Sequence, residues 1–401
     1  VRAGRMKPVH SDIRGPLFVE AMKRQKQGID ILKLNTGNPA TFGFGLPDSI
    51  KNALIEHMQD GVGYCDFKGM PQARQAICDY ETSKGIKGIT SDDVFIGNGV
   101  SEVVSFALTP LLNDGDEVLV PSPSYSLWGN SVYLEDGKPV FYTCDEQANW
   151  YPDIKDIRSK ITDKTKAIVI INPNNPTGVL YPKELLLEII QIARESGLLI
   201  FADEIYDRLV MDGKQHISLA SLTEDVPVIT LNGLSKSHCL CGYRCGWMVI
   251  SGPRELTEDY RQGIIQLTSL RLCANTMAQI VIPAALDDME TPASMVRPGG
   301  RIYEQREATV RELEKIDGLS FVKNDAAFYV FPKLDVKKFN ITNDKQFAHD
   351  LLDVTNILLV PGSGFDWKDP DHFRIVMLPQ ADILSDAIRR MGTFLDGYKQ
   401  K

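Results

Sequence analysis

The chain has 401 residues, of which 43% are hydrophobic and 24% are charged, and its net charge is −9. This balance is typical of a globular protein with a large core and two domains, and no apolar run approaches the roughly 20 residues that span a bilayer. The negative charge argues against nucleic acid or an anionic membrane as the main partner, while seven cysteines, an odd number, favour a reducing cytoplasm over a secreted disulfide framework.

The first 84 residues predict short elements separated by turns. Apolar spacing indicates a short helix within residues 11–27, a strand at 31–34, and helices at 47–57 and 72–84. The strand at 31–34 enters a turn rich in Asn, Gly and Pro at residues 35–40. Gly37 in that turn is either a plain turn residue or the point where a ligand carboxylate approaches a backbone N–H. The glycine-rich loop at 61–70 contains Tyr64.

A glycine turn then opens an apolar helix. The strand at 94–96 enters Gly-Asn-Gly-Val-Ser-Glu at residues 97–102, and the helix follows directly. The backbone N–H groups of Val100, Ser101 and Glu102 would point at an anion, and the helix dipole would favour its charge. A turn that binds nothing is the alternative. Pro110 indicates a kink or an early end of this helix.

The central third of the chain predicts a parallel sheet. The strand at 116–120 is followed by Tyr125, which either fills the core or stacks on a flat ring. The strand at 167–171, a turn containing Asn175, a helix and the strand at 198–202 form a β–α–β unit with a right-handed crossover. Asp203 and Tyr206 follow the second of these strands.

A single lysine follows the next strand, at 226–231. Lys236 lies in a loop of small residues, with Ser235 before it and Arg244 eight positions later. Open α/β sheets place ligands at strand ends, and a lysine amine can hold a carbonyl cofactor as a Schiff base. An ordinary surface charge is the alternative. Polar residues after five converging strands predict a site at this edge.

From residue 301 the pattern changes to that of a smaller α+β domain. We expect a charged helix at 301–315, strands at 326–333, 357–360 and 373–376, and a closing helix at 382–398. Arg374 lies in the last strand and suits bidentate binding of a carboxylate, unless it is a surface arginine on an edge strand. We therefore predict an N-terminal segment (1–45) packed on a C-terminal domain (296–401), with a large domain (46–295) between them.

An aromatic aldehyde phosphate held on Lys236 would give each of these side chains a role. Asp203 would keep a pyridine nitrogen protonated, although a helix cap is the alternative. Tyr206 would donate to the ring's phenolic oxygen, and Asn175 would reach that oxygen or the substrate carboxylate. Tyr125 would stack on the ring. Ser235 and Arg244 would join the backbone N–H groups of residues 100–102 at the phosphate.

Four ordered motifs carry a resemblance to a known family. They are Asn-Pro-Asn-Asn-Pro-Thr-Gly at 172–178, Ala-Asp-Glu-Ile-Tyr at 202–206, Ser-Lys with an arginine nine positions after the serine at 235–244, and Arg374. Together they resemble class I aminotransferases of the pyridoxal-phosphate fold-type I group, from about residue 14 to 398. The resemblance implies a seven-stranded, mostly parallel sheet and a homodimer. It also implies that Tyr64 reaches the neighbouring subunit's phosphate, and that Gly37, Asn175 and Arg374 bind the substrate carboxylate.

Four further segments resemble bacterial glutamate–pyruvate (alanine) aminotransferases: residues 12–16, 34–40, 97–102 and 271–275. The expected reaction is a ping-pong transfer between alanine or glutamate and pyruvate or 2-oxoglutarate, with Lys236 as the proton carrier and Arg14 as the cation for a distal carboxylate. The alternatives are that Arg14 only anchors its segment, that the specificity is for aspartate, aromatic or branched-chain substrates, or that the chain is a cystathionine-type β-lyase. A cofactor-sensing regulator is disfavoured because no basic helix-turn-helix arm precedes Arg14.

The chain departs from the family pattern at several positions. Ser11 and Ala326 stand where close relatives often have tyrosine and glycine, which could alter the substrate pocket. Gly233 stands where many relatives have a serine, so one phosphate contact is lost or moved to Ser235. Cys239, Cys241 and Cys245 lie close to the lysine, but no second ligand group with matching spacing accompanies them. We therefore expect no metal site and interpret the three as small, core-facing residues.

Overall fold

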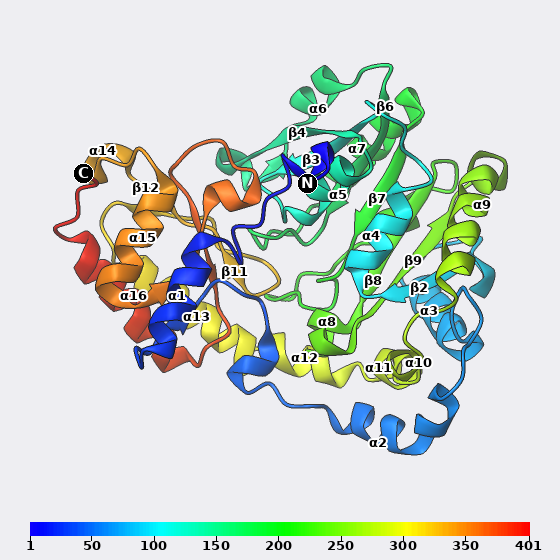
Figure 1. The fold of residues 1–401 in the computed structure, drawn as a ribbon, viewed down its shortest axis with the longest axis horizontal. Helices are drawn as coiled ribbons and strands as arrows, with labels where there is room; N and C mark the ends of the chain where they lie inside the picture. Colours follow the sequence, from blue (N-terminus) through cyan, green and yellow to red (C-terminus); the bar gives the residue numbers. More distant parts are fainter.

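In the computed structural model, which describes residues 1–401, one eight-stranded sheet dominates the chain (Figure 1). Its strand order is β2-β9-β8-β7-β6-β3-β4-β5. Strands β8, β7, β6, β3 and β4 are parallel, and β9 is antiparallel to both of its neighbours, so β2 runs in the same direction as β8. The strand bounds are β2 Val94–Asn98, β3 Glu117–Ser122, β4 Lys138–Asp145, β5 Tyr151–Pro152, β6 Thr165–Ile171, β7 Leu199–Asp203, β8 Val228–Gly233 and β9 Cys245–Ser251.

The expected mostly parallel sheet is confirmed, but the expected number of seven strands is wrong. The eighth strand is the two-residue β5, which pairs antiparallel with the end of β4. So short a strand leaves no alternation of apolar and polar residues that a sequence pattern can reveal.

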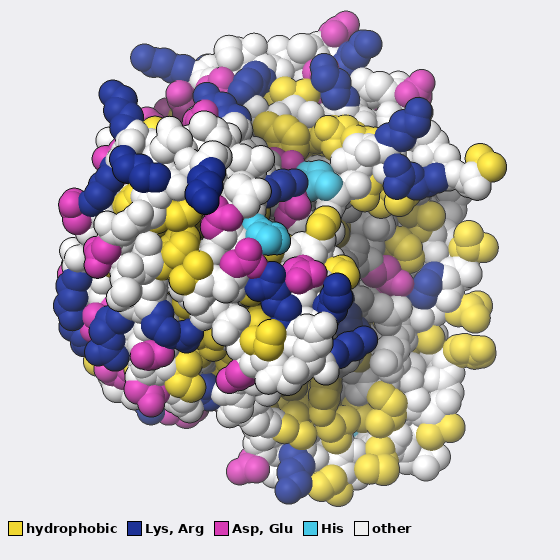
Figure 2. All heavy atoms as spheres, turned by 60° about the vertical axis from the view of Figure 1, so that its left-hand side comes forward, with side chains coloured by type: hydrophobic (Ala, Val, Ile, Leu, Met, Phe, Trp, Pro, Cys, Tyr) yellow, Lys and Arg dark blue, Asp and Glu magenta, His cyan; other side chains and the backbone are white.

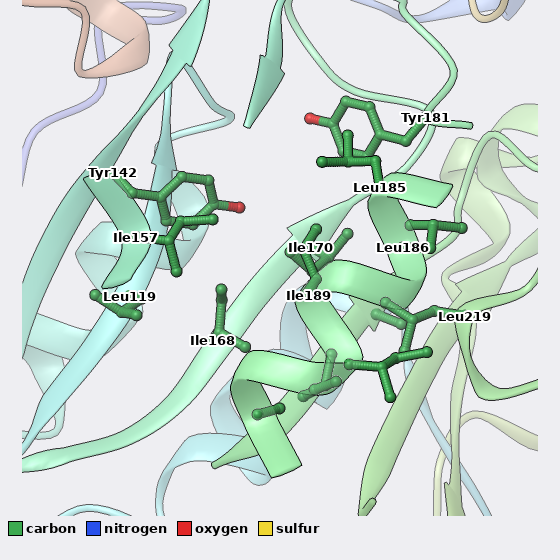
Figure 3. Close-up of a cluster of buried hydrophobic side chains, with 14 of the residues drawn as sticks. Leu119, Tyr142, Ile157, Ile168, Ile170, Tyr181, Leu185, Leu186, Ile189 and Leu219 are labelled. Atoms are coloured by element: carbon green, nitrogen blue, oxygen red, sulfur yellow. The ribbon is translucent and has the colours of Figure 1, made fainter. Parts of the chain in front are cut away.

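Helices cover both faces of the sheet because successive β-branched residues point to opposite sides. In β6, Ile168 and Ile170 pack against α7 and α6, whereas Val169 and Ile171 pack on the other face with α4, α5 and α9. Figure 3 shows Ile168 and Ile170 among the side chains of the cluster between β6 and α7. The helices around the sheet are α2 Asp48–His57, α3 Pro71–Ser83, α4 Val100–Leu108, α5 Leu127–Leu134, α6 Ile154–Lys160, α7 Lys183–Ser196, α8 Leu234–Ser237, α9 Arg254–Arg271, α10 Thr276–Gln279, α11 Ile282–Asp287 and α12 Glu290–Val296.

The helix α4 ends at Leu108, two residues before Pro110, so the proline marks an early end and not a kink. Of the regular helices in the chain, none is both long and apolar enough to cross a bilayer.

The C-terminal part, residues 296–401, builds a second core with the N-terminal segment (Figure 1). Its helices are α13 Arg301–Leu313, α14 Val336–Phe339, α15 Asp344–Thr355 and α16 Ala381–Leu395. Its strands are β10 Leu319–Ser320, β11 Tyr329–Val330, β12 Lys333–Leu334, β13 Ile357–Leu358, β14 Val360–Pro361 and β15 Phe373–Val376. From the N-terminal segment, β1 (Leu32–Lys33) pairs parallel with β13, and α1 (Pro16–Lys26) contacts α15.

The single strand expected at 326–333 is wrong, because that stretch divides into β11 and the start of β12, which belong to different sheets. The domain boundaries at residues 45 and 295 stay a prediction.

Candidate active site

The polar residues expected at strand ends lie at one edge of the sheet. Asp203 is the last residue of β7, and Lys236 lies in α8, directly after β8. Asn175 follows β6, and Gly99 separates β2 from α4. These strands run in the same direction, so their carboxyl ends meet, as ligand sites in open α/β sheets require.

The Lys236 amine faces the N-terminal segment. Its Nζ donates a hydrogen bond of 2.8 Å to the carbonyl oxygen of Gly37 and lies 5.8 Å from the centre of the Phe328 ring. The side chain is half-buried and has no carboxylate partner. Gly37 must be a glycine here, since a Cβ would lie 2.4 Å from the Tyr329 hydroxyl.

Asp203 is a buried carboxylate without a cation. Its Oδ2 accepts a hydrogen bond of 3.0 Å from Trp128 Nε1, and Oδ1 accepts a long one of 3.4 Å from the Ile205 N–H. Only 5% of the residue is exposed. Burial raises the pKa of Asp203 to about 6, against the effect of these two donors. A positively charged group placed beside Asp203 would therefore be strongly favoured.

Arg374 lies buried between two aromatic rings. Its guanidinium carbon is 4.6 Å from the centre of the Tyr329 ring and 4.7 Å from that of Phe365. Nη1 donates 2.9 Å to Asn175 Oδ1, and Nη2 donates to the Asn35 carbonyl oxygen. Burial lowers the pKa of Arg374, and no carboxylate pairs with it. The buried Nε has no partner, and neither has Asn35 Oδ1.

The start of α4 forms a cradle for an anion. Gly99 has φ +81°, and a Cβ there would lie 2.2 Å from Arg244 Nη2, so the guanidinium rests against this glycine. The N–H groups of Val100 and Ser101 lie in the first helical turn, where no intrahelical acceptor exists. The Glu102 N–H donates 3.2 Å to the Gly99 carbonyl, so it is the least available of the three expected donors.

Three of the expected residues make no side-chain hydrogen bond to this group, although Tyr125 lies near enough to Arg374 to act on it electrostatically. Tyr64 is 85% exposed, Tyr125 is 36% exposed after β3, and Arg14 is exposed without a side-chain hydrogen bond. Ser235 is half-buried beside Lys236. Their expected roles stay predictions.

The three cysteines near the lysine contact different partners. Cys241 Sγ lies 3.1 Å from the Ser235 carbonyl oxygen, Cys245 Sγ 2.9 Å from that of Ala278, and Cys239 Sγ 3.8 Å from Met295 Sδ. Cys245 is fully buried, as expected of a core-facing residue, and the other two are partly buried.

Gly233 has a steric reason to differ from serine. A Cβ at this position would lie 2.5 Å from the Cys245 carbonyl oxygen, across the antiparallel pair of β8 and β9. The backbone at this point therefore admits no side chain without moving. Of the two hydroxyls beside Lys236, that of Ser237 pairs with His238 Nδ1, which leaves the hydroxyl of Ser235 for the expected phosphate contact.

Five site residues were missed by sequence reasoning. Trp128 holds Asp203, Asn35 holds Arg374, Tyr329 contacts Tyr206, and Phe328 and Phe365 supply ring faces. Asn35 lay within a motif already quoted, and Phe328 and Tyr329 lay within a predicted strand. No local pattern tells which face of that strand meets the site.

Comparison with known proteins agrees with this geometry. The chain matches the aminotransferase class I and II family over residues 29–388. The chain belongs to this family. It is 50% identical over 399 residues to the glutamate-pyruvate aminotransferase AlaA of Haemophilus influenzae, covering 100% of this chain and 99% of that protein. It is 47% identical to AlaA of Escherichia coli K12, covering 100% and 98%.

Solved structures of this aminotransferase fold superpose closely. An aminotransferase from Escherichia coli gives a TM-score of 0.98 at 47% identity, with 100% of this chain and 99% of that chain covered. The alanine aminotransferase from Pyrococcus furiosus gives 0.94 at 40% identity, with 99% and 100% covered. The expected fold type and the expected class of enzyme, a transaminase, are thus confirmed.

Proposed function

We propose that this transaminase uses pyridoxal 5′-phosphate to exchange an amino group between L-alanine or L-glutamate and pyruvate or 2-oxoglutarate. One observation carries the proposal: Asp203, a buried carboxylate with no cation, lies one strand away from the Lys236 amine. Identities of 47–50% over the whole chain to proteins named glutamate-pyruvate aminotransferase support the choice of substrates.

The chain's own groups fit this cofactor. Lys236 offers the amine for its aldehyde, Asp203 the charge for its ring nitrogen, and Tyr206 a phenol for its phenolic oxygen. Burial raises the pKa of Tyr206, which keeps that phenol protonated and able to donate. When bound, pyridoxal phosphate supplies an imine-forming carbonyl and a ring that accepts the electron pair left at the substrate's α-carbon.

The phosphate fits the opening of α4. The Val100 and Ser101 N–H groups, with Glu102 as the weaker third donor, face the anion site. Arg244 adds a positive charge against Gly99. Three further contacts complete the proposed cofactor site: the Ser235 hydroxyl at the phosphate, Tyr125 on the ring face, and Tyr64 from a neighbouring subunit.

The substrate carboxylate fits Arg374, Asn175 and the backbone N–H of Gly37. Arg374 is already oriented by two rings and two acceptors, so binding loses little side-chain entropy. The Lys236 amine then takes the proton from the α-carbon and returns it at the cofactor's carbonyl carbon. Arg14, exposed and unpaired, would meet the distal carboxylate of glutamate or 2-oxoglutarate.

A homodimer fits the hydrophobic surface near the cofactor phosphate. The segments around Gly61 and Thr276 touch, since Thr276 Oγ1 donates to the Gly61 carbonyl. Both segments carry exposed apolar side chains. Figure 2 shows hydrophobic side chains gathered at the lower end of the molecule, the level of α2 in Figure 1. The exposed apolar residues of these segments are Met58, Val62, Tyr64, Leu270, Leu272 and Met277. We propose that a second copy of the chain covers them. We place the protein in the cytoplasm, since its seven cysteines are free thiols.

The test is a donor and acceptor screen combined with covalent trapping. Alanine with 2-oxoglutarate, and glutamate with pyruvate, should react fastest among alanine, glutamate, aspartate and valine. Borohydride should fix the cofactor to Lys236 in the wild-type protein but not in Lys236→Ala, while Lys87→Ala, at an exposed ion pair, serves as a matched control. Pyruvate released from cystathionine without an oxo-acid acceptor would instead indicate a β-lyase.

A further inference from the structure

Tyr329 in β11 touches both halves of the proposed site. Its hydroxyl oxygen lies 2.8 Å from that of Tyr206, and the two rings meet edge to face at 84° with their centres 5.6 Å apart. Its ring also covers the Arg374 guanidinium at 4.6 Å. Only 2% of Tyr329 is exposed, and its hydroxyl also packs against Gly37, where a Cβ would lie 2.4 Å away.

We propose that Tyr329 is a positioning residue with two separable roles: its hydroxyl strengthens Tyr206 as a hydrogen-bond donor, and its ring fixes Arg374 for the substrate carboxylate. This inference rests on the proposed function, because the contact of Tyr206 with the cofactor is part of that proposal.

The hydroxyl role follows from the hydrogens available. Each phenol has one hydrogen to donate and lone pairs to accept with. When Tyr329 donates to Tyr206, the Tyr206 hydrogen remains free for the cofactor's phenolic oxygen. Accepting one bond also makes Tyr206 a stronger donor, because successive hydrogen bonds polarise one another. A second orientation, in which Tyr206 donates to Tyr329, would leave the cofactor without this donor.

The ring role follows from the position of the guanidinium. Tyr329 and Phe365 cover Arg374 at nearly equal distances, and the buried Nε has no hydrogen-bond partner. Contact with the rings therefore contributes to holding the guanidinium plane along with its two acceptors, Asn175 and Asn35. Removing the Tyr329 ring would open one side of this arrangement, whereas removing only the hydroxyl would leave it intact.

The other charged groups near Tyr206 are few. Besides Tyr329, the charged groups of Arg374 and Asp203 act electrostatically on Tyr206. The Lys236 amine is hydrogen-bonded to the Gly37 carbonyl. None of these three donates to or accepts from the Tyr206 hydroxyl. A change at the Tyr329 hydroxyl therefore reaches the cofactor through Tyr206.

The test is a double-mutant cycle read by spectroscopy. The visible absorption of the cofactor-loaded protein is titrated between pH 5 and 10 in wild type, Tyr329→Phe, Tyr206→Phe and the double variant. A hydrogen-bond donor to the cofactor's phenolic oxygen stabilises the deprotonated form of the bound cofactor. Loss of that donor therefore raises the pH at which the absorption changes. We expect a rise of about 0.5 units for Tyr329→Phe and over about 1 unit for Tyr206→Phe, with no further rise in the double variant.

Kinetics separate the ring from the hydroxyl. Tyr329→Phe should lower kcat a few-fold and leave the KM for alanine within about twofold. Tyr329→Leu should raise that KM about tenfold, by loosening Arg374. Additive shifts in the double variant, an unchanged transition in Tyr329→Phe, or an unchanged KM in Tyr329→Leu would overturn the inference. Absence of any visible transition in the wild type would instead overturn the proposed function.

Discussion

The two places proposed to bind carboxylates differ in how much structure surrounds them. Arg374 is 1% exposed, lies between two rings and makes two hydrogen bonds. Arg14 is exposed and has no side-chain partner. Every amino acid carries an α-carboxylate, so a rigid receptor for it suits all substrates. Only glutamate and 2-oxoglutarate carry a distal carboxylate, and a free arginine can meet it or move aside for the methyl group of alanine. The difference teaches that, under the proposed assignment, the carboxylate common to all substrates would meet a rigid receptor and the distal carboxylate an exposed one.

The largest effect is expected at the buried arginine, Arg374. Arg374→Ala removes a buried charge and leaves Asn175 without its donor, so kcat/KM should fall about 10³-fold for alanine and glutamate alike. Steady-state kinetics with both donors measure this. Arg194→Ala, at an exposed pair with Asp225, is the control. A loss confined to glutamate would reverse the assignment of the two arginines.

The next effect concerns Asp203. Its replacement should raise the stability of the cofactor-free chain and lower the activity of the loaded enzyme. Its folded pKa of about 6 lies above the ordinary value of 3.8, so ionised Asp203 destabilises the cofactor-free chain. This penalty is complete above pH 6 and disappears as the pH falls to about 4. Asp203→Asn should therefore raise the cofactor-free unfolding free energy by about 3 kcal/mol at pH 8 and hardly at pH 4.

In the loaded enzyme the same Asp203→Asn change should lower activity about 100-fold, because the ring nitrogen loses its countercharge. Urea unfolding at the two pH values and transamination rates check the two halves. Equal stability of both proteins at pH 8 would contradict the role of burial at this residue.

A smaller effect is expected where the strand before Lys236 packs tightly. Gly233→Ala places a Cβ 2.5 Å from the Cys245 carbonyl oxygen, and the chain should lose about 1–3 kcal/mol of stability. Gly45→Ala, where a Cβ meets nothing within 4 Å, is the matched control. Thermal unfolding compares the two. If both variants melt together, the backbone here is more yielding than the packing indicates.

The smallest effect is expected at the exposed arginine, Arg14. It tests the comparison of the two arginines most directly. Arg14→Ala should lower kcat/KM about tenfold for glutamate and 2-oxoglutarate, or about 1.4 kcal/mol, and leave alanine and pyruvate unchanged. Arg2→Ala, another exposed arginine of the N-terminal segment, is the control. Unchanged glutamate kinetics would remove Arg14 from the site and leave it as an anchor of its segment.

The parts of the site that follow strands could be predicted from the sequence, because parallel strands bring their ends together wherever they occur. Lys236, Asp203 and Asn175 were found in this way. The helices and main-sheet strands that the sequence indicated mostly lie within two residues of their observed bounds, since their apolar spacing is regular. The strand β4 and the helices α5, α6 and α9 to α12 were not predicted. The two-residue β5 and the division of residues 326–333 were not, since such short pieces carry no periodicity.

The supports of the site could not be predicted, because they come from packing between distant segments. Trp128 lies 75 positions from Asp203, and Asn35 lies 339 positions from Arg374. Each is an ordinary residue within its own element, a tryptophan on an apolar helix and an asparagine in a turn. Only the folded arrangement shows that the first donates to a carboxylate and the second accepts from a guanidinium.

The pairing of β1 with β13 joins the two proposed substrate contacts, Gly37 and Arg374, into one hydrogen-bonded unit. Leu34 donates to the Leu358 carbonyl at 2.7 Å and accepts from the Val376 N–H at 3.0 Å. Gly37 follows three residues after Leu34, and Arg374 precedes Val376 in β15. A displacement of the C-terminal part would thus move Gly37 and Arg374 together. It would also part them from Lys236 and Asn175, which follow strands of the main sheet and hydrogen-bond to them at 2.8 and 2.9 Å. The distance between a bound amino acid's α-carbon and the Lys236 amine would therefore depend on how the C-terminal part sits on the sheet.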